Sequence, residues 1–419
     1  MGDQSISSEP TAAHSSALAP LRHRAFRMLA IGGLVSMVGN GIAPIALAFA
    51  VLDLTGSVTS LGLVVGARSV ASVVFLLLGG VLADRLPRRA VMVGSAALSG
   101  ASQLAVATLV LTHTATIGLL MVLSAVNGTV AAGYLPASAA ILPQTVPDGI
   151  RQQANAIARL GLNMASIGGA SGGGLIVATV GPGWGLAVDA ASFLVAGCFF
   201  ALIRVPAAGQ RAAPRASTLA QLREGWSEFV SRTWVWAVVL GFMFLNAAWA
   251  GGVQVLGPVV ADATIGRAAW GLVLATLTLG MVAGGFVALR LRVRRLLRLG
   301  VACMAVPSLV LLALAVHPTM PVLLPAAFVA GLTLEQFGVA WVTSMQHYVP
   351  ADKLGRVYSY DALGSFVAIP VGQVLAGPAA GALGSTATLL GAAGVVLAAT
   401  VGMLSSRSVR TLPREGGVR

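Results

Sequence analysis

Five ionisable side chains stand inside long apolar runs of the chain. Three are acids, Asp189, Glu335 and Asp361, and two are bases, Arg68 and Arg159. A charged side chain at the centre of a lipid bilayer costs on the order of 3 kcal/mol on insertion scales, so such residues are rare and usually serve a function. Carboxyl groups in this setting can take up and release protons, and acid–base pairs can break and re-form.

Each of these residues has a structural alternative. Glu335, in Leu334-Glu335-Gln336-Phe337, is either a proton carrier or a structural acid. Asp361 and Arg159 either pair with each other or make local contacts and extend toward the membrane surface. Arg68 either binds a ligand or neutralises a nearby acid, and we expect a structural role for Asp189.

Uncharged polar side chains form a second group of candidates. In a helical bundle such groups either contact a ligand or hold neighbouring helices together. The candidates are Asn40, Asn127, Tyr134, Asn246, Trp249, Gln254 and Trp341.

The composition indicates that lipid surrounds the elements carrying these residues. Of the 419 residues, 57% are hydrophobic and 9% charged, whereas a soluble domain carries about 25% charged residues. The net charge of +13 comes from short arginine clusters rather than a continuous basic face, so we expect no nucleic-acid partner.

Several chemistries are not expected. No His, Cys or carboxylate cluster has metal-ligand spacing, no cofactor motif is present, and Lys353, the one lysine, does not follow a glycine-rich phosphate loop. Gly169-Ala-Ser171-Gly-Gly173 formally fits a nucleophile elbow, but it lies in an apolar run. We therefore predict that the protein is not an enzyme.

Twelve apolar segments are long enough to cross a bilayer, and all must be helical because lipid cannot satisfy free backbone groups. We predict an all-α membrane protein of two pseudo-symmetric six-helix bundles. The predicted spans are 26–51, 58–82, 90–111, 115–138, 154–180, 184–203, 234–261, 269–289, 296–316, 320–344, 356–380 and 385–404.

The basic residues predict the orientation. Almost all of the 26 lysine and arginine residues fall in connections on one side; Arg267 lies on the other, and Arg68 and Arg159 lie within spans. Positive charge stays in the cytoplasm, so both termini should be cytoplasmic and the protein should lie in the cytoplasmic (inner) membrane. No cleaved signal peptide is expected.

A repeat at an offset of about 205 residues divides the chain. Gly174 and Gly181 correspond to Gly377 and Gly384, and His113 corresponds to His317. The segment 205–232 between the halves ends in a predicted amphipathic helix. The expected units are a cytoplasmic tail (1–22), the N-terminal bundle (23–204), the linker (205–232), the C-terminal bundle (233–405) and a second tail (406–419).

Two motifs resemble those of the major facilitator superfamily. The segment from Gly80 through Asp84, Arg85, Arg88 and Arg89 is similar to its signature loop between spans two and three. The resemblance implies that Asp84 contacts the start of span eleven, near Arg356, and latches the inner gate.

The second motif lies in span five and is similar to the antiporter motif of that superfamily, with a glycine where the family has proline. Span four lacks the arginine of the drug-antiporter subfamilies. The segments around Asp53, Pro136, Pro147 and Asn155 resemble the enterobactin-exporter-like and macrolide-efflux-like branch. The antiporter-like residues are Gly168, Gly169, Gly172 and Gly173.

The resemblance implies a monomeric secondary transporter in the lipid bilayer that exchanges protons for a small-molecule substrate. We expect efflux of an apolar or amphipathic drug, antibiotic or siderophore by alternating access. The alternatives are an importer or facilitator of the same fold and, from a different class, a non-transporting membrane sensor or scaffold.

Overall fold

The computed structural model describes residues 18–83, 87–204, 218–291 and 293–413. Every regular element in these ranges is helical, and twelve helical segments are long and apolar enough to cross a membrane. The predicted number of spans and their approximate positions are confirmed. The spans reach 32 residues, because several helices continue past the apolar run into polar residues.

Each of the six spans in the first half is formed by one α-helix. Short 3₁₀ turns flank them at Ala19–Arg22, Leu142–Gln144 and Asp148–Ile150. The helices are α1 (Arg24–Thr55), α2 (Val58–Ala83), α3 (Arg88–Leu111), α4 (Ile117–Ile141), α5 (Arg151–Thr179) and α6 (Pro182–Ala201).

The second half is less regular, because three of its six spans contain more than one element. A π-helical segment, Ala250–Leu256, separates α8 from α9. The elements are α7 (Thr218–Ser231), α8 (Thr233–Trp249), α9 (Gly257–Ala263), α10 (Arg267–Arg290), α11 (Leu296–Cys303), α12 (Ser308–Val316), α13 (Met320–Tyr348), α14 (Ala351–Phe366), α15 (Ile369–Leu383), α16 (Ser385–Ser405) and α17 (Arg407–Thr411).

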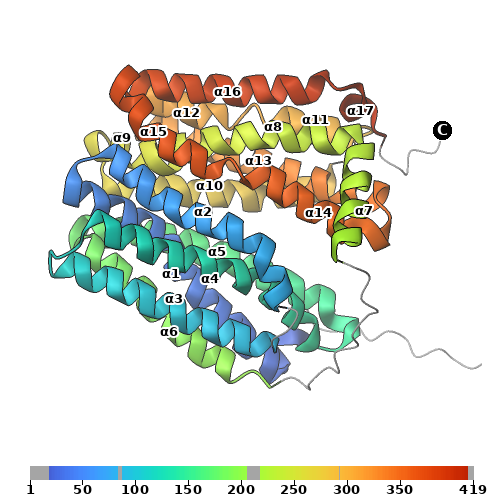
Figure 1. Ribbon diagram of the computed structural model, residues 1–419, viewed down its shortest axis with the longest axis horizontal. Helices are drawn as coiled ribbons and strands as arrows, with labels where there is room; N and C mark the ends of the chain where they lie inside the picture. Colours follow the sequence, from blue (N-terminus) through green and yellow to red (C-terminus); the bar gives the residue numbers. More distant parts are fainter. Residues whose placement is uncertain (1–17, 84–86, 205–217, 292, 414–419) are drawn as a thin grey trace, which may run out of the picture.

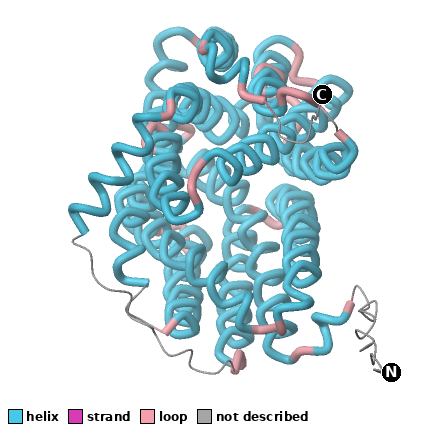
Figure 2. The backbone as a smooth tube through the Cα atoms, turned by 90° about the vertical axis from the view of Figure 1, so that its right-hand side faces the viewer, coloured by secondary structure: helices cyan, strands magenta, loops and turns pink. Residues whose placement is uncertain are grey.

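The helices form two bundles, α1–α6 and α8–α16, as Figures 1 and 2 show. Helix α2 packs against α15, and α5 packs against α10. In both contacts the second span of one half meets the fifth span of the other half, so the internal repeat relates the two contacts. Gly181 before α6 and Gly384 before α16 have φ angles of 96° and 84°, a conformation that favours glycine. The two halves therefore share both topology and local backbone geometry.

We call the end of the molecule that carries the C-terminus the terminal end, and the opposite end the distal end. The bundles contact each other toward the distal end and separate toward the terminal end (Figure 1). A Cβ atom on Gly377 of α15 would lie 2.4 Å from Cα of Thr59 at the start of α2. Small residues permit such close approach of helices, and no larger side chain would fit here.

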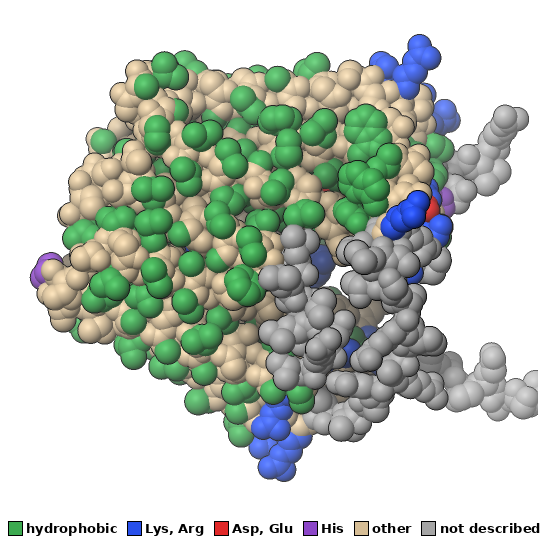
Figure 3. All heavy atoms as spheres, in the orientation of Figure 1, with side chains coloured by type: hydrophobic (Ala, Val, Ile, Leu, Met, Phe, Trp, Pro, Cys, Tyr) green, Lys and Arg blue, Asp and Glu red, His purple; other side chains and the backbone are tan. Residues whose placement is uncertain are grey.

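The surface pattern matches a lipid environment. Large apolar side chains are exposed along the helices, among them Leu289, Phe286 and Val401. In Figure 3 the visible arginine and lysine side chains gather at the terminal end. The basic connections therefore lie at the end of the molecule where the two bundles separate (Figures 1 and 3).

Candidate functional site between the bundles

An ion-pair network connects the two bundles at the distal end. Arg267 begins α10, and its guanidinium lies 2.8 and 2.5 Å from the two carboxylate oxygens of Asp53, near the end of α1. It also donates to Asp262 of α9, at 2.8 Å, and lies 4.7 Å from the ring centroid of Phe49. Paired hydrogen bonds between a guanidinium and a carboxylate fix geometry as well as charge. We call Asp53, Asp262 and Arg267 the distal network.

Glycine contacts between α5 and α10 accompany this network. A Cβ atom on Gly271 would lie 2.4 Å from the carbonyl oxygen of Ala170 and 2.9 Å from Cα of Gly174. The two backbones therefore touch, and the distal end of the seam between the bundles is closed.

The four antiporter-like glycines of α5 divide into two pairs. Gly169 and Gly173 pack on α1, where added Cβ atoms would lie 2.3 Å from the carbonyl oxygen of Val38 and 2.8 Å from Cα of Ile42. Gly168 and Gly172 have nothing within 4 Å of an added Cβ among the described residues. One face of the motif thus sets helix packing and the other is open.

Glu335 lies near the middle of α13, thirteen residues before its end at Tyr348. It is partly buried, and a Cβ atom added to Gly284 of α10 would lie 2.9 Å from Cβ of Glu335. The charge of Arg159, on α5 of the other bundle, acts on its carboxylate. The charge of a base in the N-terminal bundle thus acts on an acid of the C-terminal bundle across the seam.

Asp361 is held within its own bundle. Its carboxylate accepts a hydrogen bond of 2.9 Å from Nε1 of Trp341 and one of 3.2 Å from the hydroxyl of Ser365. Of the two alternatives for Asp361, these hydrogen bonds correspond to local contacts; no ion pair with Arg159 is found among the described residues, where the charge of Arg159 acts on Glu335. The sequence placed both residues at corresponding depths but did not show which way each helix faces.

The remaining polar candidates of the C-terminal bundle connect α8 and the π-helix to α14 and α15. The Asn246 amide donates to the carbonyl of Ser365, at 2.9 Å. Gln254, on an exposed position of the π-helix, accepts a 2.7 Å hydrogen bond from the buried Gln373. Trp249, at the end of α8, is partly buried against the core. π-Helical turns often occur at functional sites because they turn side chains out of regular register.

The buried Asp189 belongs to the interior of the N-terminal bundle. Its side chain is fully buried, and one carboxylate oxygen accepts a hydrogen bond of 2.5 Å from the Gln103 amide of α3. The other oxygen, Oδ1, has no hydrogen-bond partner among the described residues. The charge of Arg68 on α2 acts on Asp189, which corresponds to the second of the two alternatives for Arg68, a base beside a nearby acid.

The other candidates of the N-terminal bundle make local contacts. The Asn40 amide donates to the carbonyl of Ser36 one turn earlier, at 2.9 Å. The Tyr134 ring packs on Phe200, with centroids 5.9 Å apart. Asn127 is buried, and its amide nitrogen has no partner in the described part of the chain.

Two arginines of the signature loop cap helix ends at the terminal end. Arg88 donates to the carbonyl of Ala140 at 2.7 Å, and Arg89 donates to the carbonyl of Ala201. They connect the start of α3 to the ends of α4 and α6, where carbonyl groups lack partners. Gly80 lies in the last turn of α2, and Asp84 and Arg85 lie outside the described residues.

The linker helix α7 contacts the C-terminal bundle. Phe229 is buried, and Glu228 accepts hydrogen bonds from Lys353 of α14, at 2.9 Å, and from Arg232. These hydrogen bonds, that from Lys353 first, lower the pKa of Glu228 from its usual range. Arg232 also donates to the carbonyl of Tyr348, at 2.6 Å. The predicted amphipathic helix therefore packs across the terminal ends of α8 and α14, and Arg232, directly after it, binds the end of α13.

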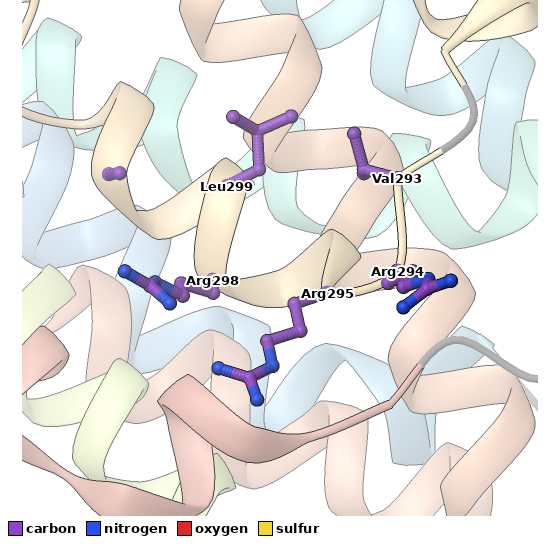
Figure 4. A pocket seen from close by; sticks show the side chains of 6 residues that line it. Val293, Arg294, Arg295, Arg298 and Leu299 are labelled. Atoms are coloured by element: carbon purple, nitrogen blue, oxygen red, sulfur yellow. The ribbon is translucent and has the colours of Figure 1, made fainter.

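Two surface pockets lie on the C-terminal bundle. A groove of about 700 Å³ lies between α8 and α16. The other, of about 480 Å³, lies at the start of α11, and Figure 4 shows its three guanidinium groups spread apart. It is lined by Val293, Arg294, Arg295, Arg298, Leu299 and Ala302.

Comparison with known proteins agrees with the helical membrane fold. The family model described as "Major Facilitator Superfamily" matches residues 29–360. The chain belongs to the major facilitator superfamily. Members of this family are transporters, not enzymes, and the twelve spans make this one a multi-pass membrane protein.

Relatives within the superfamily are distant. The chain is 24% identical over 290 residues to the uncharacterized MFS-type transporter YvqJ of Bacillus subtilis (strain 168), covering 68% of this chain and 69% of YvqJ. It is 28% identical over 240 residues to the enterobactin exporter EntS of Escherichia coli O1:K1 / APEC, covering 57% of each chain. The match thus spans little more than half of EntS.

Solved structures of superfamily transporters share this fold. The crystal structure of the nucleoside transporter NupG superposes with a TM-score of 0.72 at 15% identity, covering 91% of this chain and 98% of that one. A bacterial homologue of the human lysosomal transporter Spinster, in an inward-facing and unoccupied conformation, gives a TM-score of 0.65 at 15% identity, covering 96% and 97%.

The sequence reasoning missed the distal network and the π-helix. A signal for the network existed, because Arg267 is the one basic residue predicted on the opposite side, and an aspartate follows span one. Its pairing across 214 positions required the two bundles to be placed together. The π-helix has no comparable signal in the residue pattern.

Proposed function

We propose that this protein is a proton-coupled efflux transporter for a small apolar or amphipathic compound, working by alternating access between its two bundles. The observation that carries the proposal is the arrangement around Glu335. This acid lies in mid-span, beside the seam between the bundles, where the charge of Arg159 in the opposite bundle acts on it.

The asymmetry of the two ends supports alternating access. Ion pairs and backbone contacts join the bundles at the distal end, while the helices of the two bundles separate toward the terminal end (Figure 1). The arrangement corresponds to one of the two states that a rocking mechanism requires. Because basic residues cluster at the terminal end, we propose that this end and both termini face the cytoplasm, in the inner membrane.

A proton can supply the energy for efflux. A charge that moves down a membrane potential of about 100 mV releases about 2.3 kcal/mol, which concentrates a neutral solute roughly 50-fold. Glu335 would carry the proton, with Arg159 as the counter-charge in the other bundle. The outward direction is supported by the similarity to an enterobactin exporter.

Transport into inverted membrane vesicles tests this proposal. The probes are a panel of radiolabelled amphipathic compounds that includes macrolides and catecholate siderophores. We expect at least one probe to accumulate above vesicles that lack the protein, and an uncoupler to abolish this accumulation. Accumulation that survives the uncoupler would exclude proton coupling, and uptake only in right-side-out vesicles would favour the importer or facilitator.

A further inference from the structure

The interior of the N-terminal bundle holds a second acid whose surroundings do not satisfy it. Asp189 is fully buried, eight residues into α6 from its distal start at Pro182 near Gly181. Its Oδ1 atom has no hydrogen-bond partner among the described residues. A buried carboxylate that lacks partners is strongly disfavoured as an anion, whereas a protonated carboxyl group is tolerated.

The helices around Asp189 provide a hydrogen bond to one of its carboxylate oxygens but not to the other. Helix α6 packs on α1, α3 and α5. From α3, Gln103 donates one hydrogen bond of 2.5 Å to Oδ2. From α1, Gly39 is so close that an added Cβ atom would lie 2.4 Å from Oδ1. From α5, the contact with α6 is apolar, through Val177 beside Gly185.

Arg68 supplies the charge that opposes Asp189. It is partly buried on α2, and among the described charged side chains it is the one whose charge acts on Asp189. No hydrogen bond or ion pair joins Arg68 to another described side chain, so the two charges interact without contact. One turn earlier on α2, Val64 is buried in the interior. One turn later, the hydroxyl of Ser72 donates a hydrogen bond to the carbonyl of Gly128 in α4.

The α2 helix connects this interior to the seam between the bundles. A Cβ atom on Gly62 would lie 2.3 Å from the carbonyl oxygen of Gln373 in α15, and one on Gly66 would lie 2.8 Å from Val374. On its other side, α2 packs on α4, where a Cβ on Gly128 would lie 2.1 Å from the carbonyl of Arg68. The helix that carries Arg68 therefore makes the α2–α15 contact, which rocking of the bundles must rearrange.

From this geometry we infer that Asp189 is a second protonation site, which binds a proton when Arg68 moves away and releases it when Arg68 approaches. This inference deepens the proposed function, because it adds a coupling site inside the N-terminal bundle to the one at Glu335. The reaction is a simple transfer: the proton comes from water, binds Oδ1 of Asp189 and returns to water. No bond other than O–H forms or breaks.

Infrared difference spectroscopy of the purified, lipid-reconstituted protein between acidic and alkaline buffers tests the inference without any substrate. We expect a carboxyl carbonyl-stretch band that titrates with pH and is lost in Asp189→Asn. Asp148→Asn, which removes an acid whose side chain is 86% exposed, should retain the band. Gln103→Leu should retain the band at a shifted frequency, because it removes the amide that hydrogen-bonds the carboxyl group.

The outcomes separate this inference from the proposed function. An unchanged pH-dependent spectrum in both Asp189→Asn and Gln103→Leu would overturn the inference; if Asp189→Asn does not fold, Gln103→Leu alone decides it. In inverted vesicles, Asp189→Asn should lose the roughly 50-fold accumulation that one proton supports but keep substrate exchange. If the wild type transports without coupling while the band titrates, the proposed function fails and Asp189 remains a protonation site.

Discussion

Arg267 reaches across the seam between the two bundles and binds both carboxylate oxygens of Asp53, at 2.8 and 2.5 Å. The two residues are 214 positions apart and belong to different halves of the chain. The pair can exist only while the distal end is closed, so its energy adds to the stability of this conformation relative to any that opens there.

We predict that Arg267→Gln shifts the conformational equilibrium toward opening of the distal end. Partly exposed ion pairs contribute about 1 kcal/mol, which corresponds to roughly a fivefold change in population. Distances between spin labels at the distal ends of the two bundles would measure the shift. Asp53→Asn should act in the same direction. Asp262→Asn is the control, because Asp262 binds Arg267 within its own bundle, and an equal shift in it would contradict the prediction.

Gly271 provides a second, steric test of the distal contact. In Gly271→Ala the new methyl group would lie 2.4 Å from the carbonyl oxygen of Ala170, and such overpacking costs about 1–3 kcal/mol. We expect wider distal distances between spin labels and slower transport. Gly285→Ala, on the same helix, has nothing within 4 Å of its new methyl group among the described residues, so it should behave like the wild type.

Replacing Glu335 by glutamine removes a proton carrier but keeps the shape of the side chain. We predict that Glu335→Gln loses the roughly 50-fold accumulation available from one proton yet still exchanges substrate across the membrane. Arg159→Gln should change the pH dependence of transport, because its charge acts on Glu335. Coupled accumulation at wild-type level in Glu335→Gln would remove this residue from proton transfer.

The attachment of α7 should depend on pH through Glu228. Its pKa is lowered by Lys353 and then by Arg232, so its stabilising contribution is complete above the ordinary value of about 4.3 and is lost as the pH falls through the lowered value. Hydrogen exchange of residues 218–231 would report this loss. Glu228→Gln should reduce protection by about fivefold at neutral pH, equivalent to about 1 kcal/mol, and should remove the pH dependence.

The fold could be predicted well from the sequence because a lipid environment strongly restricts the structures that a chain can form. Lipid requires continuous helices, and twelve apolar runs leave little freedom. The repeat predicted related bundles, and Gly181 and Gly384 indeed adopt the same φ region. The breaks within α8–α9, α11–α12 and α14–α15 were not predicted, because apolar content does not distinguish an unbroken helix from an interrupted one.

The site was predicted less completely, because hydropathy indicates how deep a residue lies in the membrane but not which neighbouring helix its side chain faces. The buried acids and bases were recognised, but the partners of Asp361 proved to be Trp341 and Ser365 in its own bundle. Asp189 was expected to be structural on its position near the distal end, whereas its unpartnered oxygen became visible only once α1, α3 and α6 were packed together.

The uneven construction of the two halves bears on how the molecule moves. Each span of the N-terminal half is formed by one α-helix, while the spans of the C-terminal half contain a π-helical segment and two further breaks. Helices bend most sharply where their backbone hydrogen-bond ladder is interrupted, as it is at a π-helical segment. We therefore expect the second bundle to bend more than the first when the distal end opens, so that the two halves contribute unequal deformations to each transport cycle.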